Sequence, residues 1–237
     1  MTRELLTVDD LHVSYGDMEV IRDADLNVPA GDVVAIVGAN GAGKTTLLDA
    51  VAGVKAIDSG DVRFDGESIV GEEPFERIDR GLAYVPERHR IFPEMTVRNN
   101  LQTAMIPAAD VSRDEQLDRV FDLFPILRDR QSQVAGTMSG GQQQMLAIAQ
   151  GLVIDPDLIM FDEPTLGLAP KIVEDIRDTI VDISESGVTV LLVDEQIRMA
   201  KQVSDRMYLM RKNTLQYLGE RGEFEDAYQN AVDQVLE

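Results

Sequence analysis

The sequence predicts an α/β domain with a mainly parallel core sheet flanked by helices, a small antiparallel β subdomain and an α-helical subdomain. Short apolar runs alternate with helix-length amphipathic stretches, the pattern of parallel strands joined by crossover helices. At 237 residues the chain is also within the range of one large domain that buries its own core. We therefore expect residues 1–237 to form one domain, with the α-helical subdomain inserted at approximately residues 93–153.

The apolar runs define the strands. Segments 5–15 and 20–28 have the composition of strands with polar interruptions. Residues 62–64 end at Asp65-Gly66, a dipeptide typical of hairpin turns, so these three segments fit the antiparallel sheet. The central, mainly parallel strands are predicted at residues 33–37, 82–85, 158–161, 188–193 and 207–210.

A long helical insertion is predicted between the second and third central strands. Its clearest helix has four apolar side chains at the i, i+3, i+4, i+7 spacing of one face, namely Leu117, Val120, Phe121 and Phe124. We interpret its acidic opposite face as solvated rather than as a metal site. A later helix is expected to begin near Pro170, a favoured first helical position, and to end at Gly187.

Composition excludes several kinds of site and partner. There are no cysteines, so a disulfide or a Cys-based zinc site is impossible, and two distant histidines argue against a His-based site. The 43 acidic and 22 basic residues give a formal net charge of −21, which opposes direct binding to nucleic acid or anionic lipid. No apolar run approaches the ~18 residues that cross a bilayer.

The acidic excess also motivates the hypothesis of a salt-rich cytoplasm, in which counter-ions screen the self-repulsion of the chain. An ordinary acidic cytosolic protein is the alternative. The two explanations differ in the expected effect of salt on the melting temperature. Stabilisation between dilute buffer and molar KCl supports the first explanation, and its absence contradicts it.

Residues 38–45 fit the phosphate-loop pattern G-x-x-x-x-G-K-[ST], between an apolar strand and a predicted helix. Glycines allow backbone N–H groups to turn toward phosphate oxygens, and the helix N-terminus adds partial positive charge. Lys44 is expected to hold the β- and γ-phosphates of a nucleotide, and the Thr45 hydroxyl to ligate Mg²⁺. The predicted nucleotide-binding residues here are Gly38, Ala39, Asn40, Gly41, Ala42, Gly43, Lys44, Thr45 and Thr46.

Asp162 and Glu163 follow the apolar run 158–161. This places two carboxylates at the C-terminal edge of a strand, where α/β proteins bind ligands. Asp162 suits the Mg²⁺ shell, and Glu163 suits the activation of a water molecule. Acidic residues after a strand also commonly cap the next turn. The phosphate loop favours the catalytic interpretation.

Ser139-Gly140-Gly141-Gln142 opens another predicted helix, with Ser139 as its N-cap. Helix capping by itself would explain this serine. However, one nucleotide already has a complete cradle around Lys44, so a second glycine-bearing helix start indicates a further anion-binding surface.

Together these motifs resemble the ATP-binding cassette (ABC) family of P-loop NTPases, over essentially the whole chain. The resemblance implies the ABC cassette fold, ATP and Mg²⁺ as cofactors, and ATP hydrolysis coupled to transport. It also implies a dimer that sandwiches ATP between the phosphate loop of one subunit and the signature of the other, which here is Ser139, Gly140, Gly141 and Gln142. Met138 stands where the family usually has Leu. Tyr15 matches the family's adenine-stacking aromatic, with a core tyrosine as the alternative.

Two further positions depart from the family pattern. Glu87 occupies the glutamine-loop position, where a carboxylate can still ligate Mg²⁺ but cannot donate a hydrogen bond when ionised. Glu195 occupies the position of the switch histidine, and the two histidines of the chain, His12 and His89, lie elsewhere. An ionised glutamate repels a γ-phosphate, so either Gln196 reaches that phosphate or Glu195 acts differently.

The resemblance gives a predicted catalytic set of Glu163, Lys44 and Glu195, in which Glu163 is the main general base. Segments 84–87 and 163–170 look most like the short ATP-binding subunits of branched-chain amino acid importers. This likeness implies a peripheral protein on the cytoplasmic face of the membrane, forming a homodimer or a heterodimer with a related ATPase. The implied partners are transmembrane permease subunits and, indirectly, a substrate-binding protein, but no nucleic acid.

Three alternatives stay open in the sequence. Urea or amide importer subunits are the nearest rival, together with other amino-acid importers. A soluble ABC ATPase without a transport role would usually have a coiled-coil insertion, a tandem cassette or a basic surface, and the sequence shows none of these. A weakly catalytic regulatory subunit is made conceivable by the altered switch position at Glu195.

Overall fold

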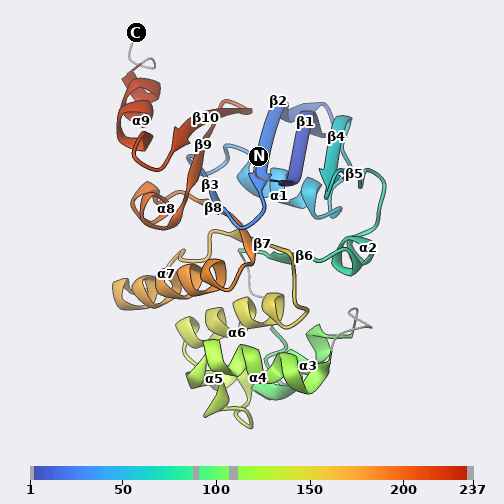
Figure 1. Cartoon of the computed structure of the whole chain (residues 1–237), viewed down its shortest axis with the longest axis vertical. Coiled ribbons are helices and arrows are strands. Elements are labelled where there is room, and N and C mark those ends of the chain that lie inside the picture. The colour runs from blue at the N-terminus through green and yellow to red at the C-terminus, as the bar shows by residue number, and fades with distance from the viewer. Residues whose placement is uncertain (1–2, 88–90, 107–111, 234–237) are drawn as a thin grey trace.

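The core of the fold is a six-stranded sheet in the order β10-β9-β3-β8-β7-β6 (Figure 1). It is seen in a computed structural model that describes residues 3–87, 91–106 and 112–233. The strands are β3 (Val33–Val37), β6 (Leu82–Val85), β7 (Leu158–Asp162), β8 (Thr189–Asp194), β9 (Arg206–Arg211) and β10 (Thr214–Glu220). All pairings are parallel except β9 with β10.

The central strands lie where the apolar runs predict them, with small differences at their ends. Strands β3, β7 and β8 are buried along their whole length, as expected for a parallel sheet covered on both faces. Strand β7 continues through Asp162, and β8 is shifted by one residue, so that it ends at Asp194. Both strands thus carry a carboxylate to the same edge of the sheet, because they are parallel neighbours.

A second, antiparallel sheet packs beside the core, in the order β2-β1-β4-β5. Its strands are β1 (Glu4–Tyr15), β2 (Met18–Pro29), β4 (Ser59–Phe64) and β5 (Glu67–Ser68). The predicted hairpin turn joins β4 to β5, where Asp65 and Gly66 have φ values of 51° and 81°. Two consecutive left-handed residues are the requirement of the tight turn that the sequence indicates.

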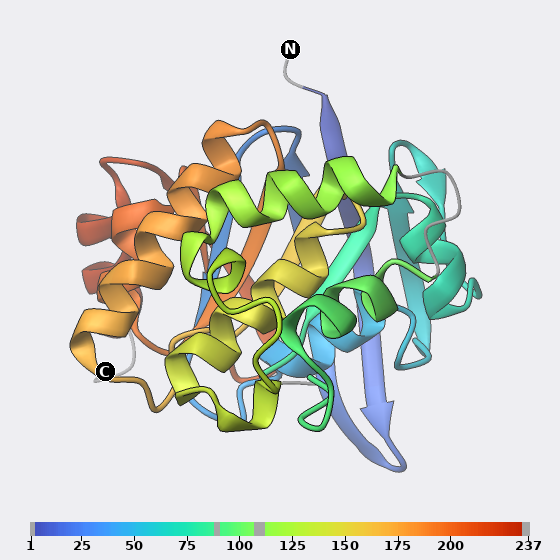
Figure 2. The same ribbon diagram turned by 90° about the horizontal axis from the view of Figure 1, so that it is seen from below.

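The helices fall into two groups on opposite sides of the core sheet. Helix α1 (Lys44–Val51) lies between the two sheets, whereas the helices that follow β6 form a layer on the other face. Figure 2 shows this layer in front of the sheet. It contains α3 (Val97–Ala104), α4 (Arg113–Leu123), α5 (Pro125–Arg128), a 3₁₀ turn (Ala135–Thr137) and α6 (Gly140–Leu152). It occupies the segment predicted for the helical subdomain, whose limits stay a prediction.

Three of the remaining helices follow strands of the core sheet along the chain, and one lies between β5 and β6. Helix α7 begins at Pro170, as predicted, and ends before Gly187, whose φ is 97°. The predicted apolar stripe from Leu117 to Phe124 is buried in the helical layer. The other helices are α2 (Pro74–Asp79), α7 (Pro170–Glu185), α8 (Ile197–Val203) and α9 (Phe224–Asp233).

The two faces of β7 belong to different hydrophobic clusters. Ile159 and Phe161 pack with the helical layer, whereas Leu158 and Met160 pack toward α1 and the antiparallel sheet. Because side chains alternate along a strand, Asp162 continues the series of Leu158 and Met160. The fold thus directs this carboxylate toward α1 and the phosphate loop.

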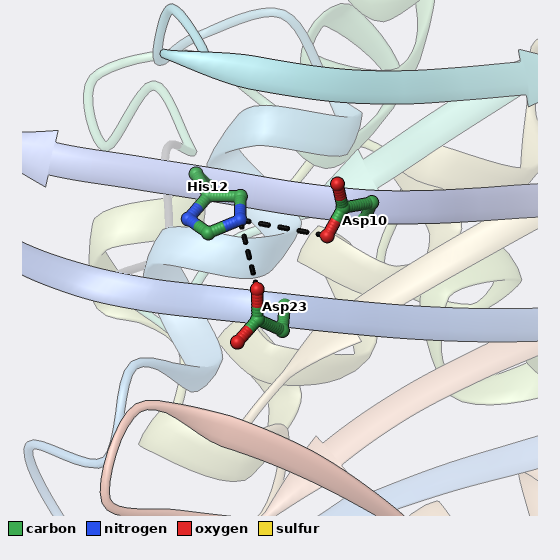
Figure 3. Close-up of side chains that lie close together, drawn as sticks. All are labelled: Asp10, His12 and Asp23. Atoms are coloured by element: carbon green, nitrogen blue, oxygen red, sulfur yellow. Dashed lines mark ion pairs between the residues drawn. The ribbon is translucent and has the colours of Figure 1, made fainter.

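His12 on β1 is surrounded by carboxylates. Its Nε2 lies 3.1 Å from Asp23 Oδ1 and 3.5 Å from Asp10 Oδ1 (Figure 3), and its Nδ1 lies 3.0 Å from Glu19 Oε1. Asp10 and Asp23 have φ values of 48° and 47°, at register shifts of the β1–β2 pair. The hydrogen bond with Glu19 is the main cause that raises the pKa of His12; burial opposes it, and Asp23 and Asp10 add to it. His89 lies outside the described residues.

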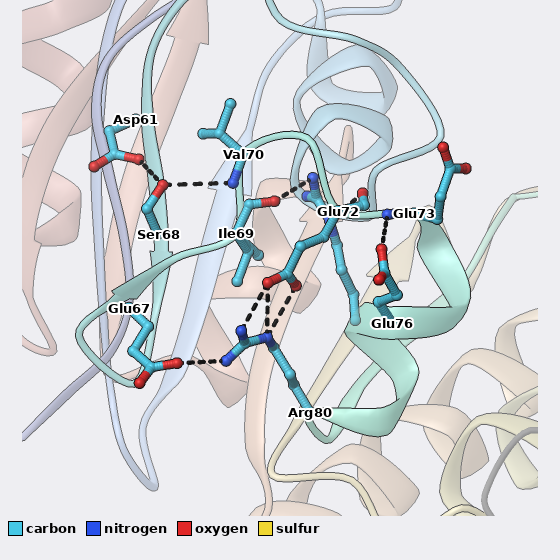
Figure 4. Close-up of polar contacts among 10 residues, drawn as sticks. Asp61, Glu67, Ser68, Ile69, Val70, Glu72, Glu73, Glu76 and Arg80 are labelled. Atoms are coloured by element: carbon cyan, nitrogen blue, oxygen red, sulfur yellow. Dashed lines mark hydrogen bonds and ion pairs between the residues drawn. The ribbon is translucent and has the colours of Figure 1, made fainter.

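Polar contacts shape the connection from β5 to β6, as Figure 4 shows. Arg80 pairs with Glu72 at 2.7 Å and with Glu67 at 2.8 Å. Helix α2 opens with a capping box in which the Glu76 side chain accepts a hydrogen bond of 2.7 Å from the backbone N–H of Glu73. These contacts hold α2 against the segment that joins it to β5.

Arg77 links α2 directly to α1. Its buried guanidinium donates hydrogen bonds of 2.9 Å and 2.6 Å to the carbonyls of Ala50 and Val51, and one of 2.9 Å to Ile69. Burial lowers the pKa of Arg77, and the nearby Glu72 opposes this shift. A cation at the C-terminus of a helix offsets the partial negative charge of its free carbonyls. Arg77 thus secures the far end of the helix that begins in the phosphate loop.

Candidate active site

The phosphate loop connects β3 to α1 and passes very close to β9. A Cβ atom on Gly38 would lie 2.4 Å from the carbonyl oxygen of Met210, a distance that only backbone movement could relieve. Gly43 is the N-cap of α1 and has a φ of 108°. Glycine is required at both places, at the first for space and at the second for conformation.

Lys44 lies inside this loop rather than in solvent. Its side chain is 4% exposed, and its Nζ donates hydrogen bonds to the carbonyl oxygens of Gly38 at 2.9 Å and Ala39 at 3.2 Å. The same Nζ lies 3.0 Å from Glu163 Oε1, a carboxylate that is 8% exposed. The structure thus joins the cation of the loop to the carboxylate that follows β7.

Asp162 is 2% exposed at the end of β7. Burial raises its pKa to about 6; the polar interaction with the Thr45 side chain opposes this shift, and the charges of Glu163, Glu87 and Asp49 add to it. Its Oδ1 is buried without a hydrogen-bond partner among the described residues. Such an atom requires an explanation, because buried polar atoms are normally satisfied.

A divalent cation would satisfy this oxygen. The Thr45 hydroxyl and Asp162 provide oxygen ligands, which Mg²⁺ prefers, and the charge of Glu87 acts on the same carboxylate. Glu87 is exposed, two residues after the end of β6. The residues present therefore fit a magnesium ion bound next to the phosphate loop.

The backbone of Glu163 is held by the neighbouring strand. Its N–H donates a 2.9 Å hydrogen bond to the carbonyl of Val193 on β8, and its carbonyl accepts one of 3.1 Å from Leu166. Its φ of 47° lies in the left-handed region. This conformation is uncommon for a residue other than glycine and often marks a functional site.

Asp194 is a buried carboxylate that the sequence analysis did not select. It is 2% exposed; its Oδ1 accepts a 2.7 Å hydrogen bond from the N–H of Gln196, and its Oδ2 accepts one of 3.0 Å from the Thr165 hydroxyl. Burial raises its pKa, the bonds from Gln196 and Thr165 oppose this, and Glu163 adds to it. The signal that selected Asp162, an acid at the end of an apolar strand, also applies to Asp194.

Glu195 and Gln196 follow β8 and are both exposed. Asp194 shapes their turn, because it accepts the backbone N–H of Gln196. The same aspartate contacts Thr165, in the segment that follows Glu163. The Asp194 side chain therefore connects the turn at the predicted switch position to the segment after Glu163.

Tyr15 ends β1 and is 48% exposed. The Lys55 ammonium lies 4.3 Å from the centre of its ring, within the range of a cation–π contact. A core-packed tyrosine, the alternative considered from the sequence, does not agree with this exposure. The stacking of adenine on this ring stays a prediction.

The segment Ser139–Gln142 lies at the start of α6. Ser139 is the predicted N-cap: its hydroxyl accepts a 3.4 Å hydrogen bond from the N–H of Gln142, whose side chain accepts one of 3.1 Å from the N–H of Ser139. Ser139 and Gly140 are exposed, whereas Gly141 is buried against Ile172. In Figure 1, α6 lies across the core sheet from α1. The fold thus separates this segment from the phosphate loop of the same chain.

Comparison with known proteins identifies the family of the chain. The model of the family described as ABC transporter matches residues 21–166, a range that includes the phosphate loop, Ser139–Gln142, Asp162 and Glu163. The chain is also 39% identical over 211 residues to the high-affinity branched-chain amino acid transport ATP-binding protein BraG of Pseudomonas aeruginosa, with 89% of this chain and 91% of that protein covered. The chain belongs to the ABC transporter family.

Two more relatives are similar in sequence, and a solved structure is similar in fold. The chain is 34% identical over 220 residues to a probable branched-chain amino acid transport ATP-binding protein, LivF, of Archaeoglobus fulgidus, covering 92% of this chain and 93% of that protein. It is also 34% identical over 211 residues to the lipopolysaccharide export system ATP-binding protein LptB of Haemophilus influenzae, covering 87% and 86%. The ADP conformation of the ABC-transporter cassette MJ1267 superposes with a TM-score of 0.88 at 25% identity, covering 99% of both chains.

These similarities establish the ABC cassette fold and the general activity. The chain is a nucleotide-binding ABC transporter ATPase subunit, which hydrolyses ATP. Within the part of the chain that the structure describes, no helix combines the length and the apolar character that a membrane span requires.

Proposed function

We propose that this ABC ATPase powers the uptake of branched-chain amino acids through separate membrane subunits. The observation that carries the proposal is the 39% identity to a branched-chain amino acid transport ATP-binding protein over 91% of that protein's length. The similarity to LivF extends over 92% of this chain and supports the same substrate class. The ATPase would act at the cytoplasmic face of the membrane, beside transmembrane permease subunits.

The proposed reaction uses half of the site from each of two subunits. The phosphate loop of one subunit binds ATP, and Ser139 and Gly141 of the other contact the γ-phosphate, with Gly140 and Gln142 in the same turn. The separation of α6 from α1 within one chain supports this arrangement. Two exposed N-terminal residues of a helix, Ser139 and Gly140, are available to such a partner. The partner is a second copy of this chain or a related ATPase.

Thr45 and Asp162 would hold Mg²⁺, with Glu87 as a third candidate ligand. When bound, the ion offsets negative charge that develops on the phosphates. Lys44 exchanges its contact with Glu163 for the β- and γ-phosphates. Glu163, released from Lys44, accepts a proton from the attacking water as general base. Tyr15 provides a ring surface for adenine.

The switch position is proposed to work without histidine. Glu195 is exposed and has a charge that a γ-phosphate repels, whereas the adjacent Gln196 has an amide that can donate. Asp194 holds the Gln196 backbone next to the end of β8. Separate Glu195→Gln and Gln196→Ala variants in the assembled transporter distinguish the two residues, because the one that senses the phosphate loses turnover when changed.

The substrate is tested with the complete transporter. The chain is purified with its membrane subunits, reconstituted in vesicles with ATP inside, and supplied with the substrate-binding protein and labelled leucine, isoleucine or valine. ATP-dependent uptake that Glu163→Gln abolishes supports the proposal. Transport of urea, amides or cystine without branched-chain amino acids contradicts the substrate class, as does copurification with lipopolysaccharide export subunits, a possibility raised by the similarity to LptB.

A further inference from the structure

A phenol lies between two carboxylates beside the candidate magnesium site. Tyr84 on β6 has its hydroxyl 3.1 Å from Asp49 Oδ1 and 3.5 Å from Asp162 Oδ2. Asp49 belongs to α1, the helix that starts in the phosphate loop, and Asp162 ends β7. One side chain thus connects three elements that meet at the nucleotide site.

The register of the core sheet explains this contact. Tyr84 pairs with Met160 on the adjacent parallel strand, and both side chains pack toward α1. Asp162 lies two residues beyond Met160 and therefore points to the same face. This packing holds the tyrosine ring so that its hydroxyl lies beside Oδ2 of Asp162.

The hydroxyl acts as a donor at this position. A phenol carries its proton at neutral pH, and both neighbours of this hydroxyl are carboxylate oxygens, which accept hydrogen bonds. A hydroxyl has one hydrogen that can rotate between two acceptors. When Asp162 is ionised with a cation on one oxygen, its other oxygen can accept this hydrogen, while Asp49 remains close to the phenol.

The two oxygens of Asp162 therefore have different surroundings. Oδ2 faces Tyr84, whereas Oδ1 is buried without a hydrogen-bond partner among the described residues. We propose that Tyr84 is a positioning residue that engages Oδ2 of Asp162 and thereby leaves Oδ1 directed at Mg²⁺. This inference rests on the proposed role of Asp162 as a magnesium ligand. Partners that orient metal ligands typically change metal affinity by about 10- to 100-fold.

The test measures nucleotide affinity with and without magnesium, rather than turnover. A fluorescent ATP analogue is titrated into the wild-type chain and into Tyr84→Phe, in excess Mg²⁺ and in EDTA. Tyr84→Phe keeps the ring but loses the hydroxyl. We therefore expect unchanged affinity for the ATP analogue in EDTA, and an increase of this affinity by Mg²⁺ that is about tenfold smaller than in the wild type. Direct Mn²⁺ binding, followed by electron paramagnetic resonance in the presence of ATP, is expected to weaken by a similar factor.

The matched control is Tyr217→Phe. Tyr217 lies on β10, is 46% exposed and packs against the ring of Tyr208, so its hydroxyl removal should leave the magnesium enhancement intact. A Tyr84→Phe variant with wild-type enhancement and Mn²⁺ affinity overturns the inference. Equal losses in EDTA and in Mg²⁺ also overturn it, because they indicate general damage to the loop. A wild-type chain without any magnesium enhancement instead refutes the magnesium site itself.

Discussion

The Nζ atom of Lys44 lies 3.0 Å from Oε1 of Glu163, and both side chains are almost completely buried. This ion pair connects the phosphate loop to the carboxylate after β7, the two parts of the site that the proposed reaction uses together. A buried charge that loses its partner is costly unless another replaces it. A bound phosphate is the natural replacement for Glu163 next to Lys44.

Glu163→Gln is expected to separate ATP binding from hydrolysis. The amide cannot act as a general base, so ATP turnover of the assembled transporter should fall by about 100-fold or more. ATP affinity should be unchanged or higher, because the neutral amide does not compete with the phosphates of ATP for Lys44. Turnover and equilibrium binding of a fluorescent ATP analogue measure the two effects. Glu115→Gln, at an exposed acid on α4, is the matched control, and wild-type turnover in Glu163→Gln refutes its role as base.

Asp162→Asn is expected to stabilise the chain without magnesium and to abolish stabilisation by magnesium. Because its pKa is raised from 3.8 to about 6, the carboxyl reduces folding stability as the pH rises through this interval, and the full cost remains at pH 7.5. Removing that charge should raise the melting temperature in EDTA by about 2–8 °C. Thermal melts at pH 7.5, with ATP in EDTA or Mg²⁺, test this. A variant with the melting temperatures of the wild type in both EDTA and Mg²⁺ contradicts the role of Asp162 as a buried charge that binds magnesium.

Thr165→Val should weaken the connection between Asp194 and the segment after Glu163. The substitution removes a hydroxyl that donates to Asp194 at 3.0 Å, in a place where both residues are at most 2% exposed. The carboxylate then loses a partner at a cost of about 1–3 kcal/mol of unfolding free energy. Urea unfolding measures this loss. Thr165→Ser retains the hydroxyl and should recover most of the stability, and equal losses in both variants would mean that packing dominates.

His12 is expected to make stability depend on pH in the neutral range. Its pKa is raised in the fold above the ordinary 6.5, chiefly by Glu19, so protonation favours the folded chain. This contribution is complete below pH 6.5 and is lost as the pH rises through the higher folded value. The stability difference between wild type and His12→Gln should therefore shrink from pH 6 toward pH 9 in urea unfolding. A difference that is constant with pH contradicts the ion pairs around His12.

Local sequence patterns were sufficient to predict the features that lie within one segment of the chain. The strand at Val33–Val37 and the turn at Asp65-Gly66 follow from apolar runs and from backbone preferences, and both are present as expected. Ser139 as an N-cap followed from its place before a helix, and its hydrogen bond with Gln142 agrees. The motif positions Lys44 and Asp162 were also visible, because family motifs are local in the chain.

Contacts between distant segments could not be predicted from local sequence patterns. Arg77 was an ordinary charge in a short helix until the fold placed it on the carbonyls of Ala50 and Val51. Asp194 and Thr165 are 29 residues apart and meet only because β7 and β8 are parallel neighbours. Tyr84 had no assigned role until the register of β6 and β7 placed it beside Asp162.

By itself, the sequence determined the class of the protein: an α/β ABC cassette with a phosphate loop, two carboxylates after a strand and a signature segment on another helix. These depend on short motifs and on periodicity, both of which are properties of neighbouring residues. Only the tertiary structure decided that Lys44 pairs with Glu163 and that Asp162 has one oxygen near Tyr84 and one with no hydrogen-bond partner among the described residues. The reason is physical, since strand register and burial determine which distant polar atoms meet and which are left unpaired.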